Sequence, residues 1–159
     1  MNILLFLRKT VFQCFKIEFM GKISETFGHV NQISLKDDCI SYNSGNAYGK
    51  LRFYRDSIVN VVLSRDEIKN NHSYAVVRSP EKVHTSYIKD DRLLKFNSDK
   101  LKIELDVDNG KISIFDCKGK LISRDGLAVR WSGTEVVVCK DLLDGEKFVG
   151  LGEKTGPLN

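Results

Sequence analysis

The chain has 159 residues, which is the size of one domain and too short for a domain plus a large catalytic barrel, since such a barrel alone takes roughly 250 residues. Hydrophobic residues make up 42% and charged residues 29%, an ordinary globular balance that excludes a disordered chain, a collagen-like chain and a bundle of membrane helices. The net charge is +4 and the basic residues are interleaved with acids, so we expect no nucleic-acid partner.

Residues 1–19 are predicted to be an upstream extension outside the fold. The apolar run Ile3–Leu7 is short, and Arg8 and Lys9 follow it, whereas a secretory signal carries its charges in front. The run is also too short and too charged to span a membrane, so no membrane partner is expected. Met20 opens a stretch that reads like a natural start. We therefore expect the fold to begin at Met20, and the lack of a secretory pattern favours the cytoplasm.

From Val30 onward the sequence predicts β-strands almost without interruption. Short runs rich in Val, Ile, Phe and Tyr are separated by Asp, Asn, Ser or Gly. No window carries the 3.6-residue apolar repeat of a helix over three turns. The fold class is therefore predicted to be all-β, an antiparallel β-sandwich. The predicted strands are 30–36, 39–42, 50–54, 58–63, 74–77, 83–88, 93–96, 101–107 and 135–140.

The clearest local pattern is a hairpin over residues 101–116. From Leu101 to Val107, apolar residues alternate with charged ones, and Ile112 and Ile114 continue the apolar face. Asn109-Gly110 supplies the two positive φ angles that a type I′ turn requires. We therefore predict a hairpin with one buried face, followed by a second turn at 116–120.

Residues 145–159 form a short apolar stretch followed by a dense glycine loop. Gly150, Gly152 and Gly156, with Pro157, demand a backbone path that few other residues can follow. The loop begins as G-x-G, yet the third glycine comes one residue too late for a dinucleotide-binding loop and no helical pattern follows. No dinucleotide cofactor is predicted.

The residues that often bind metals are scattered. No CxxC pair is present, the cysteines are interpreted as free thiols, and the histidines are isolated. The acidic stretch 106–110 lacks the spacing of a calcium loop. We therefore predict no metal and no cofactor. The residues considered are Cys14, Cys39, Cys117, Cys139, His29, His72 and His84.

The adjacent carboxylate pairs do not suggest a catalytic dyad. Neighbouring residues of a strand point to opposite faces, and charged pairs are common where strands end. No G-x-S-x-G motif supports a hydrolase triad. No catalytic residue is predicted in this chain. The pairs are Asp37-Asp38, Asp66-Glu67 and Asp90-Asp91.

Residues from about Lys50 to Asn159 resemble the N-terminal domain of glycoside hydrolase family 31, the α-glucosidase and α-xylosidase family. The most specific match is EKFVGLGEKTGPLN at 146–159, where Val149 replaces a usual aromatic residue. Asn60 likewise stands where an arginine is common. The other matching stretches are LRFYRDSIVNVVLS at 51–64, SYAVV at 73–77 and FNSDKLKIELDVDNGKISIFDCKGKLISRD at 96–125.

This resemblance implies a galactose-mutarotase-like β-sandwich over 20–144 and, over 145–159, the start of the junction toward a (β/α)8 catalytic barrel. Family members are retaining α-glycosidases that act on α-linked oligosaccharides without a metal. Both catalytic carboxylates lie in the barrel, the nucleophile within a W-x-D-M signature. Here Trp131, the one tryptophan, is followed by Ser132 and Gly133, so the signature is absent. The chain is expected to be inactive alone, scaffolding the barrel and rimming its sugar pocket.

Two alternatives stay open: a stand-alone carbohydrate-binding sandwich and a structural or interaction domain. Glu153 and Thr155 are the polar members of the matching motif, and they serve either sugar contact or capping of their own loop. A fragment would expose an apolar patch where the barrel docks. The patch would comprise Phe148, Val149, Leu151 and Leu158. The aromatic platforms of a sugar-binding face would come from Tyr42, Tyr48, Tyr54, Tyr74, Tyr87 and Trp131.

Overall fold

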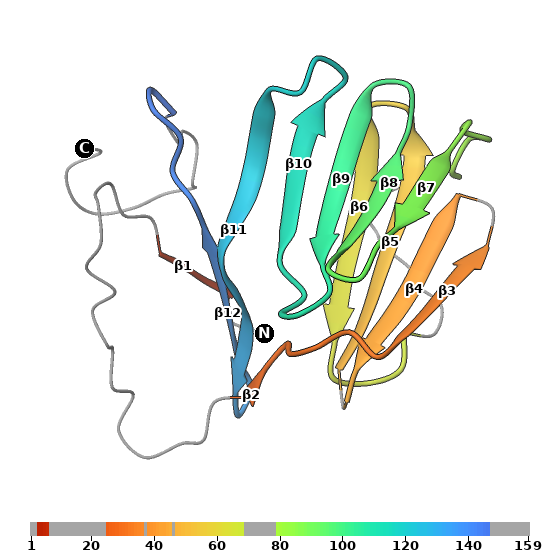
Figure 1. Cartoon of the computed structure of the whole chain (residues 1–159). Helices are drawn as coiled ribbons and strands as arrows, with labels where there is room; N and C mark the ends of the chain where they lie inside the picture. The colour runs from red at the N-terminus through yellow and green to blue at the C-terminus, as the bar shows by residue number, and fades with distance from the viewer. Residues whose placement is uncertain (1–2, 7–24, 37, 46, 69–78, 147–159) are drawn as a thin grey trace.

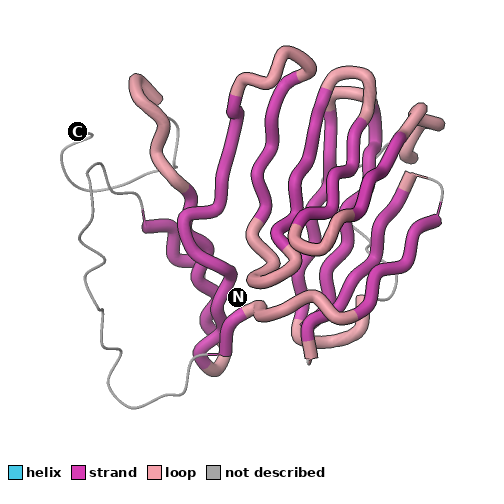
Figure 2. Tube along the Cα trace, in the orientation of Figure 1, coloured by secondary structure: helices cyan, strands magenta, loops and turns pink. Residues whose placement is uncertain are grey.

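The computed structural model describes residues 3–6, 25–36, 38–45, 47–68 and 79–146, and these contain strands and loops but no helix (Figure 2). The predicted all-β fold is confirmed. The strands are β1 (Ile3–Phe6), β2 (Glu25–Thr26), β3 (Gln32–Lys36), β4 (Cys39–Ser44), β5 (Ala47–Arg55), β6 (Ile58–Ser64), β7 (Ser86–Lys89), β8 (Leu93–Asn97), β9 (Leu101–Asp106), β10 (Ile112–Asp116), β11 (Leu121–Ser132) and β12 (Glu135–Lys140).

The strands form two sheets that face each other (Figure 1). The larger sheet has the order β1-β12-β11-β10-β9-β8-β7, with β2 paired to β11, and the smaller sheet has the order β3-β4-β5-β6. Neighbouring strands are antiparallel except for β1 and β12, which are parallel. Apolar side chains of both sheets fill the space between them, so the fold is the predicted sandwich.

The core follows from the two-residue period of the strands. β5 alternates buried and half-buried residues along its length, and β9 places Leu101, Ile103 and Leu105 inward. Phe53 of the smaller sheet meets Phe96 of the larger one with ring centroids 4.8 Å apart. The buried apolar core comprises Phe27, Val30, Ile40, Tyr42, Ala47, Leu51, Phe53, Val83, Leu94, Phe96, Leu101, Ile103, Leu105, Val107, Ile112, Val129 and Trp131.

The predicted hairpin over 101–116 is confirmed as β9 and β10, with Leu105 opposite Ile112 and Ile103 opposite Ile114. The predicted type I′ turn is wrong, because Asp106 pairs with Lys111 and the loop therefore holds residues 107–110. Gly110, the last residue of this loop, has a positive φ of 71°. The physical cause is the position of Val107. Its N–H donates to the Arg92 carbonyl and its own carbonyl accepts the N–H of Val30, so Val107 does not pair within the β9–β10 ladder.

β11 was not predicted as a strand. Its sequence places Ser123, Arg124, Asp125 and Gly126 together, which breaks the apolar alternation. The structure accommodates this stretch with register shifts between Asp125 and Leu127 and between Leu127 and Arg130. A bulge adds a residue to one strand, so a strict period of two could not reveal this strand.

The other predicted boundaries differ from the structure at a few ends. The strand predicted at 30–36 begins at Gln32, the one predicted at 83–88 begins at Ser86, and 74–77 lies outside the described residues. Within the predicted extension 1–19, Ile3–Phe6 pairs with β12 in the larger sheet. The rest of that extension also lies outside the described residues, so its boundary stays a prediction.

Two arginine contacts connect parts of the chain that are distant in sequence. Arg65, just after β6, donates to the Glu25 carboxylate at 2.8 and 3.1 Å and to the Gly133 carbonyl at 2.8 Å. Arg55 at the end of β5 pairs with Glu81 at 2.6 Å. The first contact connects the smaller sheet to the β11–β12 turn of the larger one.

Candidate functional site

Most of the candidate aromatic platforms are not available as a flat sugar-binding surface. Tyr42 and Trp131 are buried in the core, where Phe27 contacts both rings. Tyr48 and Tyr54 are half-buried on β5, and Tyr87 on the edge strand β7 is 54% exposed. Tyr74 lies outside the described residues. Tyr87 is therefore the one well-exposed member of the candidate set within the described ranges.

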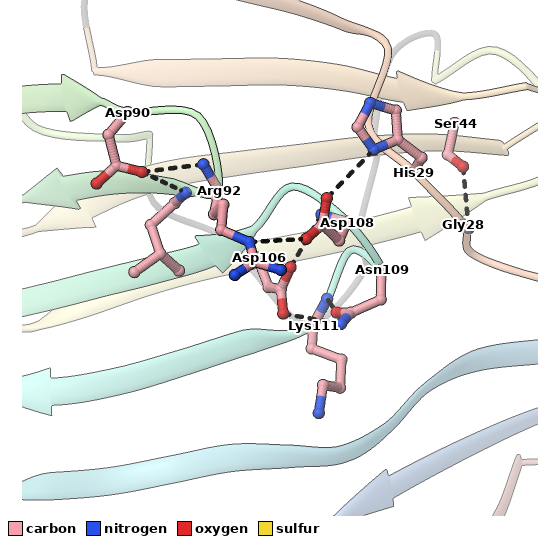
Figure 3. Close-up of polar contacts among 10 residues, drawn as sticks. Gly28, His29, Ser44, Asp90, Arg92, Asp106, Asp108, Asn109 and Lys111 are labelled. Atoms are coloured by element: carbon pink, nitrogen blue, oxygen red, sulfur yellow. Dashed lines mark hydrogen bonds and ion pairs between the residues drawn. The ribbon is translucent and has the colours of Figure 1, made fainter.

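The loop cluster at one end of the sandwich gathers acidic residues around the β9–β10 loop (Figure 3). The Asp106 carboxylate accepts two hydrogen bonds from its own loop. Its Oδ1 accepts the N–H of Asp108 at 2.9 Å, and its Oδ2 accepts the side-chain amide of Asn109 at 2.7 Å. The Asp108 carboxylate lies 3.7 Å from His29 Nδ1 and 3.3 Å from Arg92 Nε. These contacts close the loop, which is the ordinary role of aspartate in turns.

Asp90 belongs to the same cluster and caps the β7–β8 turn. Its Oδ1 accepts the N–H of Leu93 at 2.8 Å and the N–H of Arg92 at 3.0 Å. These two bonds, that from Leu93 first, lower the pKa of the Asp90 carboxyl because they favour its charged form. The carboxylate therefore stabilises the turn.

The lowered pKa of Asp90 predicts a pH dependence. Its contribution to stability should be fully present above the unfolded-state pKa of about 3.9 and should be lost as the pH falls through the lower folded-state pKa. Thermal unfolding of the wild type and Asp90→Asn between about pH 2 and 6 measures it. The gap between the two should close as the pH falls. Asp91→Asn is the matched control, and a gap of constant size at all pH values would refute the contribution of the Asp90 charge to stability.

Asp125 is a buried charged residue among those that the structure describes, and no sequence pattern indicated it. It is only 4% exposed, its Oδ2 accepts the N–H of Ile112 at 2.8 Å, and its Oδ1 pairs with Lys140 Nζ. The carboxylate thus connects β10, β11 and β12. Burial, with the Asp125 charge as a smaller cause, raises the pKa of the nearby Tyr42 hydroxyl far above its ordinary value. Asp125 stabilises the core and is shielded from a soluble substrate.

Asp125→Ala is expected to lower the free energy of unfolding by about 3 kcal/mol. The change leaves the Ile112 N–H without its acceptor, while Lys140, whose side chain is 34% exposed, can turn toward water and limit the loss. Urea unfolding measures the effect. Asp125→Asn keeps an acceptor oxygen and should therefore cost less stability than Asp125→Ala. Equal stability of the Ala variant and the wild type would contradict the stabilising role of Asp125.

A polar pocket lies where three segments meet at the other end of the sandwich. The β5–β6 turn supplies Arg55, Asp56 and Ser57, the segment before β7 supplies Glu81, Lys82 and Val83, and the β8–β9 turn supplies Lys100. Its volume is about 270 Å³. The residues come from positions far apart in the chain, so no local motif could have predicted the pocket.

The other predicted features are placed as follows. His29 and His84 are exposed on loops, each 3.7 Å from an aspartate, and no disulfide involves Cys39 or Cys117. The described residues contain no group of three His, Cys, Asp or Glu side chains placed to hold a metal, and no apolar helix of membrane-spanning length.

Glu153, Thr155 and the predicted apolar patch at 148–158 lie outside the described residues.

Residues 49–159 match the glycosyl hydrolase 31 N-terminal galactose mutarotase-like domain. Among curated proteins, α-glucosidase 2 of Bacillus thermoamyloliquefaciens is 30% identical over 136 residues, which cover 83% of this chain and 17% of that protein. The chain therefore spans about a sixth of the length of this relative.

Two solved enzymes share the fold. A glycoside hydrolase family 31 dextranase of Flavobacterium johnsoniae, solved with isomaltotriose, superposes with a TM-score of 0.74 and 22% identity over 85% of this chain and 18% of that one. A cycloalternan-forming enzyme of Listeria monocytogenes, solved with a pentasaccharide substrate, gives a TM-score of 0.57 and 13% identity over 69% of this chain and 11% of that one. At these identities the likeness establishes the sandwich fold alone.

Proposed function

The chain belongs to glycoside hydrolase family 31 as its N-terminal galactose mutarotase-like domain, and from this membership we propose that it is a non-catalytic domain of a retaining α-glucosidase-type enzyme. Its role would be to scaffold a catalytic barrel of the same polypeptide and to help rim the pocket that holds an α-linked oligosaccharide. The observation that carries the proposal is the family match from residue 49 to residue 159, combined with coverage of only 17% of the α-glucosidase.

The chemistry of the described carboxylates supports a non-catalytic role. A retaining glycosidase needs two carboxyl groups about 5 Å apart across the scissile bond, with one of them kept protonated to act as the acid. Asp90 and Asp106 instead accept hydrogen bonds from their own turns, and Asp125 is paired with Lys140 in the core. The environment of Asp90 favours its charged form, the opposite of what a catalytic acid needs.

The relatives support an oligosaccharide as the ligand of the complete enzyme. The dextranase was solved with isomaltotriose, and the cycloalternan-forming enzyme with a pentasaccharide. The burial of Tyr42 and Trp131 weighs against a stand-alone sugar-binding surface built on those two rings. We therefore place the principal sugar-binding site in the catalytic part of the enzyme.

The proposal is tested by assaying hydrolysis of maltose and isomaltose by the 159-residue chain and by the polypeptide extended with the sequence that follows Asn159 in the gene. We expect no turnover by the chain alone and turnover by the extended polypeptide. Hydrolysis by the purified chain alone, at a rate that survives further purification, would contradict the non-catalytic role.

A further inference from the structure

The β5–β6 turn and the β8–β9 turn lie at the same end of the sandwich (Figure 1), and together with the segment before β7 they line the polar pocket. The Glu81 N–H donates to the Tyr54 carbonyl at 3.0 Å, and the Glu81 carboxylate pairs with Arg55 at 2.6 Å. Ser98 Oγ donates to the Asp56 carbonyl at 2.6 Å, which connects the two turns. The two turns and the Arg55–Glu81 pair are therefore held in place before any ligand arrives, which lowers the entropic cost of binding.

The lining determines which ligand chemistry fits. Val83 is buried, whereas the other lining residues are polar. Arg55, Lys82 and Lys100 donate hydrogen bonds, Asp56 and Glu81 accept them, and Ser57 does both. Carboxylates in the wall disfavour an anion, and three basic side chains disfavour a cation. Hydroxyl groups, which donate and accept at once, match such a mixed lining.

We propose that this pocket is a secondary, non-catalytic binding site for the end of a neutral oligosaccharide. Its volume of about 270 Å³ lies close to the lower end of the range for small-molecule sites, roughly 300 to 1,000 Å³. The adjacent Arg55–Glu81 pair offers a donor beside an acceptor, which suits two neighbouring hydroxyls of one sugar ring. That the sugar is an α-linked glucan rests on the proposed function, whereas the preference for a neutral polyol rests on the pocket alone.

The test is a titration of the isotope-labelled 159-residue chain with maltotriose and with isomaltotriose, followed by backbone amide NMR. A small polar pocket of this size predicts a Kd on the order of 1 mM. The shifts should centre on Ser57, Glu81, Lys82 and Lys100. No shift with either sugar, or shifts confined to other surfaces, would overturn the proposal.

Variants and a second probe sharpen the test. Glu81→Gln keeps the size of the side chain and removes its charge, so binding should weaken by about fivefold, whereas Lys118→Ala on the β10–β11 turn should bind as the wild type does. Both positions are exposed, and thermal unfolding checks that each variant is folded. Inorganic phosphate is the second probe, and stronger shifts of the same amides with phosphate would overturn the proposal in favour of an anion site.

The outcomes separate this proposal from the proposed function. The titration uses no catalysis, so its failure leaves the role as a hydrolase domain unaffected. Conversely, sugar binding by a chain whose gene encodes no catalytic barrel would support the pocket and contradict the proposed function.

Discussion

Ile112→Asp is expected to abolish the cooperative fold, with a loss of more than about 4 kcal/mol in the free energy of unfolding. Ile112 is 2% exposed, faces Leu105 across the β9–β10 ladder and donates its N–H to Asp125. The substitution would bury a new carboxylate next to an existing one. Circular dichroism during urea unfolding measures the loss.

Ser113→Asp is the matched control for this substitution. Ser113 is the next residue of β10, points to the opposite face and lies between Glu104 and Arg124 in the sheet. The same charge there should remain hydrated and change stability by less than about 1 kcal/mol. An Ile112→Asp protein as stable as Ser113→Asp would refute the assignment of the buried face.

Gly49→Ala is the second substitution with a large expected effect. Gly49 lies opposite Tyr42 in the β4–β5 ladder, and a Cβ atom there would lie 2.2 Å from Cζ of the Tyr42 ring. The ring is buried in the core against Phe27, with centroids 5.5 Å apart, so it cannot turn aside freely. We expect a loss of about 3 kcal/mol, because inserting a methyl group into a packed core forces the neighbours to shift. Thermal and urea unfolding measure it.

A double-mutant cycle tests the cause of that loss. In the Tyr42→Leu background the ring is gone, so Gly49→Ala should cost much less than it does in the wild type. A loss of equal size in both backgrounds would show that the glycine is needed for some other reason. A stabilised Gly49→Ala protein, the usual outcome where space permits, would show that the contact with the ring is absent.

The strands that could be predicted are those whose burial follows a simple alternation. β9 and β10 form a hairpin with one buried face, and the alternation of apolar and charged residues from Leu101 onward predicts that face. The turn joining them could not be predicted from Asn109-Gly110, because the position of Val107 depends on Arg92 and Val30, which are distant in the chain. Turn residues are local signals, whereas loop length here is set by tertiary contacts.

β11 and its buried Asp125 show a second limit of sequence reasoning. Ser, Arg, Asp and Gly in succession indicate a loop, yet the structure places them in a bulged strand whose aspartate faces the core. The partners of that aspartate are a backbone N–H of β10 and a lysine of β12, and only the assembled sheet brings them together. A buried charge with distant partners leaves no periodic signal in the sequence.

The family could be predicted from a local motif in the sequence, whereas the polar pocket could not. The resemblance from about Lys50 to Asn159 identified the family, because its glycine-rich motif at 146–159 is local and specific. The polar pocket could not be predicted, because Arg55, Glu81 and Lys100 meet only once three segments have folded together. The aromatic candidates are predicted from residue type alone. Their burial is known only from the structure, in which Tyr87 is exposed whereas Tyr42 and Trp131 lie in the core.

The central claim is that this chain is the sandwich domain of a larger α-glucosidase-type hydrolase, and the most direct test is to sequence the gene downstream of the codon for Asn159. We predict that the following sequence encodes a (β/α)8 barrel carrying the W-x-D-M nucleophile signature. A downstream region that encodes no such barrel, in this frame or in any other, would contradict the claim.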